Sequence, residues 1–214
     1  MIIIDFDDTL FDTQKFKQEL ASSLVSLGIG KELFWQTYAE ARIMSDGNFS
    51  YSFERHANIL EKEGFDCEQV LNNLNKVIEK IKNFLFDDTI DFLESLKKSE
   101  QDLYLLSLGD ESFQKLKVGE CDIAKYFKKV FFRGKDKELV VEEILAENKD
   151  SNIFFINDKI EESQKIKKDF PNIEVILKQA VTFAEEEYKN GGLKYFKTLA
   201  QINTNLSTPA GKQE

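Results

Sequence analysis

The chain has 214 residues, of which 42% are hydrophobic and 32% are charged, a composition typical of folded globular proteins and not of disordered ones. Acidic residues outnumber basic ones by 39 to 29, and no Lys/Arg cluster stands apart from acids, which argues against nucleic-acid binding. No apolar run approaches the roughly 20 residues of a membrane span, and the N-terminus lacks the basic segment of a signal peptide. We therefore expect a cytoplasmic protein with no membrane partner.

Cysteine and histidine are too rare for several kinds of site. Cys67 and Cys121 fit neither a disulfide framework nor the spacing of a zinc site. His56 is the only histidine, which excludes a multi-histidine zinc centre. It lies in a stretch with the pattern of an amphipathic helix, and we interpret it as a structural or surface residue.

The first predicted element is a short strand in the apolar run 1–4, which is followed at once by Asp5, Asp7 and Asp8. From about residue 14 to residue 86 the pattern changes, because apolar residues recur at helical spacing and no segment resembles a strand. Two stripes show this spacing: Phe16, Leu20, Leu24 and Leu27, then Val70, Leu74, Val77, Ile81 and Leu85. We predict an all-helical insertion over 14–86, with a capping box at Asp66 and Gln69.

A helical pattern at 87–101 precedes four more apolar runs, at 102–107, 129–135, 153–158 and 172–178, with helix-like stretches between them. Such runs, which lack polar alternation, are typical of strands covered on both faces. Their alternation with helices predicts an α/β fold, a Rossmann-like parallel sheet flanked by helices, built from 1–13 and 87–202. The polar segment 203–214 is predicted to be a disordered tail.

Residues with catalytic potential end each of the first four runs. Asp5 and Asp7 follow the first, Ser107 ends the second, Lys135 ends the third, and Asn157 with Asp158 ends the fourth. Ligands of open parallel sheets bind beyond the carboxyl ends of the strands. We therefore predict an active site at this edge of the sheet.

The residues at the ends of these four apolar runs resemble the four motifs of the haloacid dehalogenase-like hydrolase superfamily, both in their types and in their order along the chain. Most members of this superfamily are phosphatases. "IIIDFDDT" resembles the first motif, an apolar strand followed by Asp-x-Asp-x-Thr, and "LYLLS" the second. "RGKDKELV" resembles the third motif and "IFFIND" the fourth. The likeness extends from Met1 to Leu177 in the motif order of the family.

The resemblance implies a role for each matching residue. Asp5 would attack a phosphoryl group and form an aspartyl-phosphate, and Asp7 would protonate the leaving oxygen and later deprotonate water. Ser107 would hydrogen-bond a phosphoryl oxygen, although a hydroxyl satisfied by the backbone is the alternative. Lys135 would bring positive charge to the phosphoryl group and to Asp5, with Lys137 as the rival lysine.

A cation would relieve the crowding of acids at this site. Asp5 and Asp158, with the backbone carbonyl of Asp7 as implied by the family, would hold Mg²⁺. Asn157 departs from the usual fourth motif, in which an acid or a glycine stands, and the effect of that change on metal binding and activity is left open. Glu162 lies where one form of the motif places its second acid.

In this superfamily a helical insertion after the first motif is a cap that closes over the site, which favours a small phosphorylated metabolite as substrate. Aromatic residues at 34–38 and 49–53 either pack the core of the cap or contact the substrate.

The predicted function is that of a Mg²⁺-dependent phosphatase that hydrolyses a small phosphomonoester. The alternatives are a phosphotransferase or mutase, and a catalytically weak member that binds a phosphorylated ligand as a sensor or partner protein. An acid at residue 7 argues against a dehalogenase, since a carbon–halogen bond needs no proton delivered to its leaving group. The oligomeric state is left open.

Overall fold

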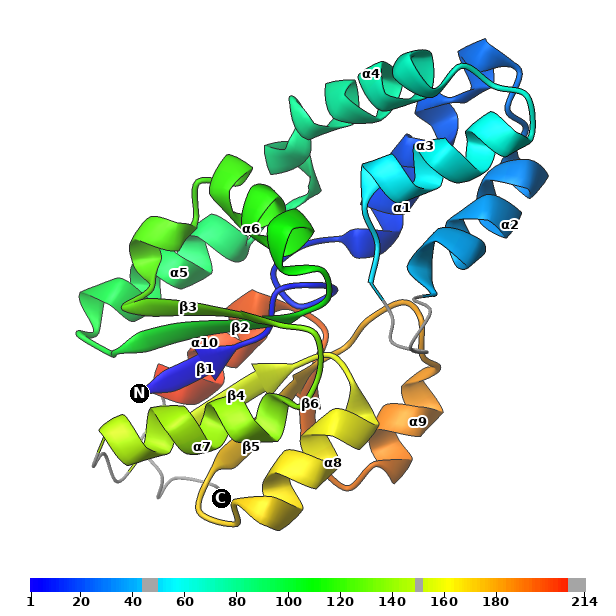
Figure 1. Cartoon of the computed structure of the whole chain (residues 1–214). Coiled ribbons are helices and arrows are strands. Elements are labelled where there is room, and N and C mark those ends of the chain that lie inside the picture. Colours follow the sequence, from blue (N-terminus) through cyan, green and yellow to red (C-terminus); the bar gives the residue numbers. More distant parts are fainter. Residues whose placement is uncertain (44–49, 149–151, 208–214) are drawn as a thin grey trace.

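A computed structural model of the chain describes residues 1–43, 50–148 and 152–207. Its centre is one parallel sheet with the strand order β3-β2-β1-β4-β5-β6 (Figure 1). The strands are β1 (Ile2–Ile4), β2 (Leu103–Leu108), β3 (Lys129–Arg133), β4 (Phe154–Asn157), β5 (Glu174–Lys178) and β6 (Lys194–Phe196). The predicted Rossmann-like parallel sheet is therefore confirmed, and its five expected strands are joined by β6, which is three residues long.

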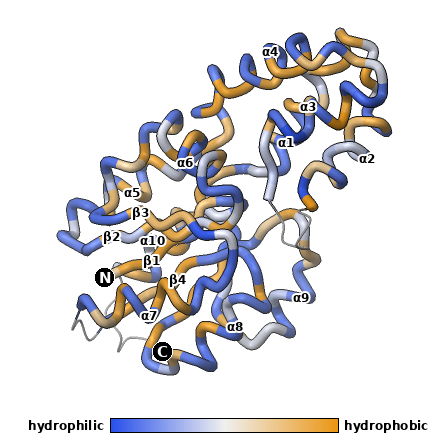
Figure 2. Tube along the Cα trace, in the orientation of Figure 1, coloured by the Kyte–Doolittle hydropathy of each residue, from blue (hydrophilic) through white to orange (hydrophobic). Residues whose placement is uncertain are grey.

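Helices cover both faces of the sheet because alternate residues of each strand point to opposite sides. Ile2 and Ile4 belong to a core that includes α5 (Thr89–Lys98), α6 (Glu111–Glu120) and α10 (Leu199–Ser207). Ile3 belongs to a second core with α7 (Lys137–Glu147) and α8 (Ile160–Asp169). Figure 2 shows β1 and β4 as mostly hydrophobic, α7 as a mixture of hydrophobic and hydrophilic residues, and α8 as mostly hydrophilic.

Two segments near the C-terminus complete this half of the molecule. In chain order, helix α9 (Glu185–Asn190) connects β5 to β6. Helix α10 continues to Ser207, and its Asn203 side chain hydrogen-bonds Ser95 of α5. The prediction of a disordered tail from 203 is therefore wrong for 203–207, because this turn packs on α5, and 208–214 lie outside the described residues.

Between β1 and α5 the described chain forms helices only, as the apolar spacing predicts. We call this segment the helical insertion; it comprises α1 (Thr13–Ser23), η1 (Val25–Leu27), α2 (Lys31–Arg42), α3 (Phe53–Lys62), α4 (Cys67–Ile78) and η2 (Ile81–Phe84). It stands apart from the helices that cover the sheet, at the upper right of Figure 1. No helix in the described ranges is long and apolar enough to span a bilayer.

The helices of the insertion pack on a core that is continuous with the core on one face of the sheet, and the N-termini of α1 and α4 are capped. Most residues of the two predicted stripes are buried in that core. Asp12 begins α1 and its side chain accepts from the backbone N–H of Lys15 at 2.8 Å, while Asp66 accepts from that of Gln69 at 2.8 Å. Each cap satisfies a backbone donor that the first helical turn leaves unpaired.

His56 is fully buried in this core between two hydroxyl groups. Its Nε2 lies 2.9 Å from Thr37 Oγ1 and its Nδ1 lies 2.9 Å from the Tyr51 hydroxyl. The Thr37 hydroxyl donates to the carbonyl of Leu33, so we assign the ring proton to Nε2, and Tyr51 donates to Nδ1. The imidazole is therefore a structural link between α2 and α3, and burial lowers its pKa to about 4.

Acidification should weaken the insertion. Because the folded pKa of His56 lies below the usual 6.5, the unfolded chain binds the proton more readily, and stability is lost as pH falls from 6.5 through 4. The full loss is about 3 kcal/mol. Since His56 is the only histidine, an NMR titration of its ring resonances should show a midpoint near 4. A midpoint near the unperturbed value would contradict this account.

Candidate active site

The predicted residues at the strand ends meet in one cavity of about 650 Å³. Asp5, Asp7, Ser107 and Asp158 all line it. Asp5 follows β1 directly and donates its backbone N–H to the carbonyl of Ile156 in β4 at 2.9 Å. Because β2, β1 and β4 are neighbours and run in the same direction, their carboxyl ends deliver these side chains to one edge of the sheet.

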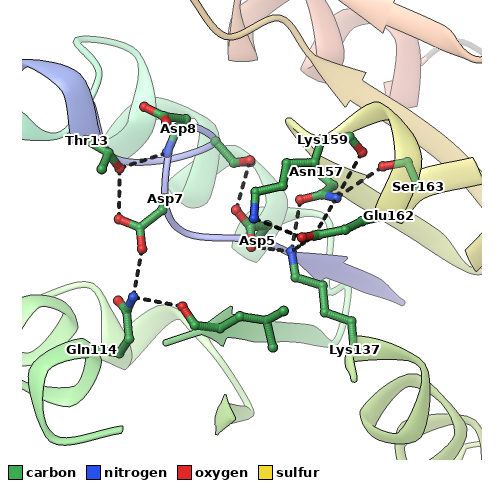
Figure 3. A network of polar contacts seen from close by, with 12 residues as sticks. Asp5, Asp7, Asp8, Thr13, Gln114, Lys137, Asn157, Lys159, Glu162 and Ser163 are labelled. Carbon is green, nitrogen blue, oxygen red and sulfur yellow. Dashed lines mark hydrogen bonds and ion pairs between the residues drawn. The ribbon is translucent and has the colours of Figure 1, made fainter. Parts of the chain in front are cut away.

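A buried lysine from α7 neutralises the acid after β1. Lys137 Nζ lies 2.6 Å from Asp5 Oδ1 and 2.9 Å from Glu162 Oε2, and only 3% of its side chain is exposed (Figure 3). The second oxygen of Asp5 accepts from the Thr9 hydroxyl at 3.2 Å. Burial alone would lower the pKa of Lys137, but the two carboxylates raise it overall, so the lysine stays charged.

The lysine that contacts Asp5 is therefore Lys137, and the prediction of Lys135 for this contact is wrong. Lys135 lines the cavity but is exposed. The reason lies in the intervening residue: Asp136 has φ 63°, in the left-handed region, and the turn it makes starts α7 at Lys137. This places Lys137 on the inner side of the first helical turn.

Asn157, where the resemblance leads one to expect an acid or a glycine, organises its neighbours and is not among the residues that line the cavity. Its Oδ1 accepts from Lys137 at 3.0 Å, and its Nδ2 donates to Ser163 Oγ at 3.1 Å and to the carbonyl of Lys159 at 3.3 Å (Figure 3). An amide can accept and donate at once, which a carboxylate cannot. Asn157 therefore ties β4, α7 and α8 together without adding a further negative charge.

Four buried side-chain polar atoms have no hydrogen-bonding partner within the described ranges: Ser107 Oγ, Gln114 Oε1, Asp158 Oδ1 and Gln179 Oε1. The first three belong to residues that line the cavity. Burial raises the pKa of Asp158 to about 8, with a further contribution from the nearby Asp5. Burial also raises the pKa of Asp5, which Lys137 opposes. Unpaired buried polar atoms are costly, so this edge is built to receive groups from outside the chain.

The donor set fits a magnesium ion. Mg²⁺ is commonly bound through one or two carboxylates together with water and substrate phosphate, and Asp5 and Asp158 supply two carboxylates at adjacent strand ends. No group of three or more His, Cys, Asp or Glu residues suited to a metal occurs in the described part of the chain. The described chain thus offers two carboxylates, and a bound ion would take its remaining ligands from elsewhere.

Asp7 is held by three donors that sequence reasoning missed. Lys117 Nζ lies 2.6 Å and Thr13 Oγ1 lies 2.8 Å from Oδ1, and Gln114 Nε2 lies 2.8 Å from Oδ2. Burial alone would raise the pKa of Asp7, but Lys117 and these hydrogen bonds lower it below its usual value. The available signal was the i, i+3 spacing of Gln114 and Lys117, which puts two polar residues on the inner side of α6.

The helical insertion forms the opposite wall of the cavity. Tyr38 and Tyr51 are buried and line it, while Phe34 is packed inside the insertion. Phe34 therefore packs the core of the insertion, whereas contact of Tyr38 or Tyr51 with a substrate stays a prediction; Phe49 lies outside the described residues. Ser50 Oγ donates to Asp110 Oδ2 at 3.0 Å, and the Tyr51 ring packs on Phe113 of α6 with centroids 5.3 Å apart. The insertion and the sheet half meet through α6.

Comparison with known proteins bears on the family and on the fold separately. A family model described as haloacid dehalogenase-like hydrolase matches residues 1–149. No curated protein matches the sequence.

Several solved structures share the fold over almost the whole chain. A protein from Burkholderia xenovorans described as a haloacid dehalogenase-like hydrolase has a TM-score of 0.75 at 14% identity and covers 95% of this chain and 94% of its own. A Clostridium acetobutylicum protein described as a phosphatase gives 0.59 at 17%, with 96% of each chain covered. A Thermotoga maritima protein described as a β-phosphoglucomutase gives 0.65 at 17%, with 96% and 97% covered. At such identities the likeness shows the fold alone.

The two candidate lysines should differ sharply when each is replaced by methionine. Lys137→Met leaves Asp5 and Glu162 without their shared buried cation and should cost about 3 kcal/mol of unfolding free energy. Lys135→Met removes an exposed charge and should change stability by less than about 0.5 kcal/mol. Urea unfolding of both variants at neutral pH measures this, and equal losses would show that Lys137 is not the internal partner of Asp5.

Proposed function

Because the chain belongs to the haloacid dehalogenase-like hydrolase family, we propose that it is a Mg²⁺-dependent phosphatase acting on a small phosphomonoester through an aspartyl-phosphate on Asp5. The observation that carries the proposal is the grouping of Asp5, Asp7, Ser107, Lys137 and Asp158 around one cavity. This set contains a nucleophile, an acid–base group, a donor for a phosphoryl oxygen and countercharge. The family includes enzymes of other reaction types, so the phosphatase assignment rests on these residues.

Asp5 supplies the nucleophile and Asp7 the proton. In the first step a carboxylate oxygen of Asp5 forms a bond to phosphorus, the bond to the leaving oxygen breaks, and Asp7 gives its proton to that oxygen. In the second step water attacks the phosphorus while Asp7 accepts its proton. The bond between phosphorus and Asp5 then breaks, which releases inorganic phosphate and restores the Asp5 carboxylate.

The donors around Asp7 are consistent with its proposed roles as general acid in the first step and general base in the second. Lys117, Gln114 and Thr13 fix both carboxyl oxygens, so the group is held in one orientation for both proton transfers. These contacts favour the ionised form, which is the state that the second step requires of a base. The negative charge of a bound phosphomonoester would raise the pKa of Asp7 and so favour the protonated form for the first step.

Lys137 and Ser107 would hold the transferred group. Lys137, already 2.6 Å from Asp5, brings positive charge to the point where the carboxylate meets the phosphoryl oxygens. The unpartnered hydroxyl of Ser107 supplies a donor in the same cavity. Lys135, exposed at the cavity wall, is a further candidate contact for the phosphoryl group.

Mg²⁺ would be held by the carboxylates of Asp5 and Asp158 and the backbone carbonyl of Asp7. When bound it would polarise a phosphoryl oxygen and neutralise charge at this edge. The unpartnered Asp158 Oδ1, in a carboxyl group whose pKa is about 8, supports this placement, because a nearby cation favours the ionised carboxylate.

Phosphate release tests the proposal. Wild type and Asp5→Asn are incubated with an aryl phosphate and a panel of small phosphomonoesters, with Mg²⁺ or with EDTA. Wild type should release phosphate only with Mg²⁺, and Asp5→Asn should lose at least 1,000-fold of kcat, since the amide cannot act as the nucleophile. Glu161→Gln, at the cavity wall but outside this chemistry, is the matched control and should retain activity.

If no phosphate is released, thermal melting with Mg²⁺ shows whether the metal site is absent or whether the panel lacks the right substrate. Mg²⁺ should raise the melting temperature of wild type, since a ligand that binds only the folded state stabilises it. Asp158→Asn should not respond. Absence of turnover together with a normal Mg²⁺ response would leave the metal site in place and favour the role of a phosphoryl-ligand binder. Absence of both would contradict the proposal.

A further inference from the structure

The wall of the cavity formed by the helical insertion is positively charged. Helix α1 turns Thr13, Phe16, Lys17 and Leu20 toward the cavity, the i, i+3, i+4, i+7 face of a helix. Arg42, the last residue of α2, lines the cavity as well. The two cations come from different helices and meet at the same part of the cavity.

Lys17 and Arg42 share one aromatic neighbour. Lys17 Nζ lies 6.0 Å from the ring centroid of Tyr38, and Arg42 Cζ lies 5.8 Å from the same centroid. Two cations placed around one ring repel each other, and the contact with the ring compensates only part of that cost. An anion in the cavity beside them would reduce this repulsion.

Lys17 differs from four of the other lysines around the cavity, which are paired, and from Lys135, which has no ion pair within the described ranges but is exposed. Lys117 and Lys137 contact Asp7 and Asp5, and the more exposed Lys159 and Lys165 pair with Glu162 and Glu138. Lys17 is half-buried and makes no hydrogen bond or ion pair with the residues that the structure describes.

The surroundings of Lys17 disfavour its charge when the cavity is empty. Burial lowers the pKa of Lys17, the nearby Asp8 opposes this change, and Arg42 adds to it. Asp8 accepts a hydrogen bond from Gln14 at 3.1 Å and does not pair directly with the lysine. The ammonium group therefore has room for an incoming partner.

The position of Lys17 relative to Asp7 indicates which part of a substrate it faces. Lys17 lies one helical turn beyond Thr13, about 6 Å along α1, and Thr13 donates directly to Asp7. Under the proposed function Asp7 protonates the leaving oxygen. Lys17 therefore lies in the part of the cavity near Asp7, where the leaving group would sit under the proposed function.

We propose that the substrate carries a second anionic group, a carboxylate or a second phosphate, on its leaving group, and that Lys17 binds it with Arg42 alongside. The proposal rests on the proposed phosphatase function and adds the class of substrate to it. A competing role, in which Lys17 only balances the charge of Asp8, makes a different prediction: it would affect all substrates alike, whatever charge their leaving groups carry.

Matched substrates test the second anionic group. 3-Phosphoglycerate differs from glycerol 3-phosphate in having a carboxylate in place of a hydroxymethyl group, and propane-1,3-diol bisphosphate differs from propyl phosphate by a second phosphate. Wild type should prefer the charged member of at least one pair by tenfold or more in kcat/KM. The pair that shows the preference identifies the second group as carboxylate or phosphate.

Variants of α1 assign that preference to Lys17. Lys17→Met should reduce the ratio of kcat/KM values to within about threefold of unity, and Lys17→Arg, which keeps the charge, should retain most of it. Lys15→Met is the matched control, because Lys15 lies on the same helix but is exposed and does not line the cavity. It should leave the ratio unchanged. Thermal melting of each variant confirms that it is folded.

Two results would overturn the proposal while leaving the phosphatase function intact: no preference in wild type for either charged substrate, or a preference that Lys17→Met retains. Calorimetric binding of the same pairs to Asp5→Asn tests the subsite without turnover. If wild type hydrolyses nothing but Asp5→Asn binds a charged member at least tenfold more tightly than its partner, the phosphatase function fails and the anion subsite stands. Equal binding within both pairs would refute the subsite.

Discussion

The site depends on two buried carboxylates that the sheet brings together. Asp5 and Asp158 follow neighbouring parallel strands, β1 and β4, so the fold itself brings the two carboxyl groups close together. Lys137 compensates Asp5, but Asp158 keeps an unpartnered oxygen and a raised pKa. The folded chain therefore does not fully compensate the buried carboxylate charge at this edge of the sheet. We propose that Mg²⁺ and a phosphoryl group provide the missing interactions.

Each of the two reactive aspartates has its own buried lysine, and the two lysines come from opposite faces of the sheet. Lys137 of α7 serves Asp5 and Lys117 of α6 serves Asp7. Under the proposed function, this separation would let Asp5 act as the nucleophile while Asp7 is held for proton transfer. Helix α6 also contacts the helical insertion, where Phe113 packs against Tyr51. Helix α6 thus contacts both Asp7 and the insertion.

The sequence predicted those features that follow directly from a local pattern of residues, such as a strand from an apolar run. Apolar runs ending in acids located β1 and β4, and the shared direction of parallel strands then placed Asp5 and Asp158 at one edge. The choice between Lys135 and Lys137 could not be made, since it depends on the left-handed backbone of Asp136. The partnership of Lys117 with Asp7 spans 110 positions and depends on how α6 packs, which helical periodicity does not specify. Strand β6 was missed because its residues, Lys194–Phe196, lie at the sheet edge and form no apolar run like that of β1.

The most direct test of the account is capture of the phosphoryl group on the protein. The Asp7→Asn variant lacks the base for the second step, so after acid quenching of a reaction with acetyl phosphate and Mg²⁺ it should retain a covalent phosphoryl group. Acetyl phosphate suits this variant because its leaving group needs no proton. Peptide mapping should place the adduct on Asp5, in the tryptic peptide Met1–Lys15. A phosphoryl group on another residue, or none while wild type turns over the same substrate, would contradict Asp5 as the nucleophile.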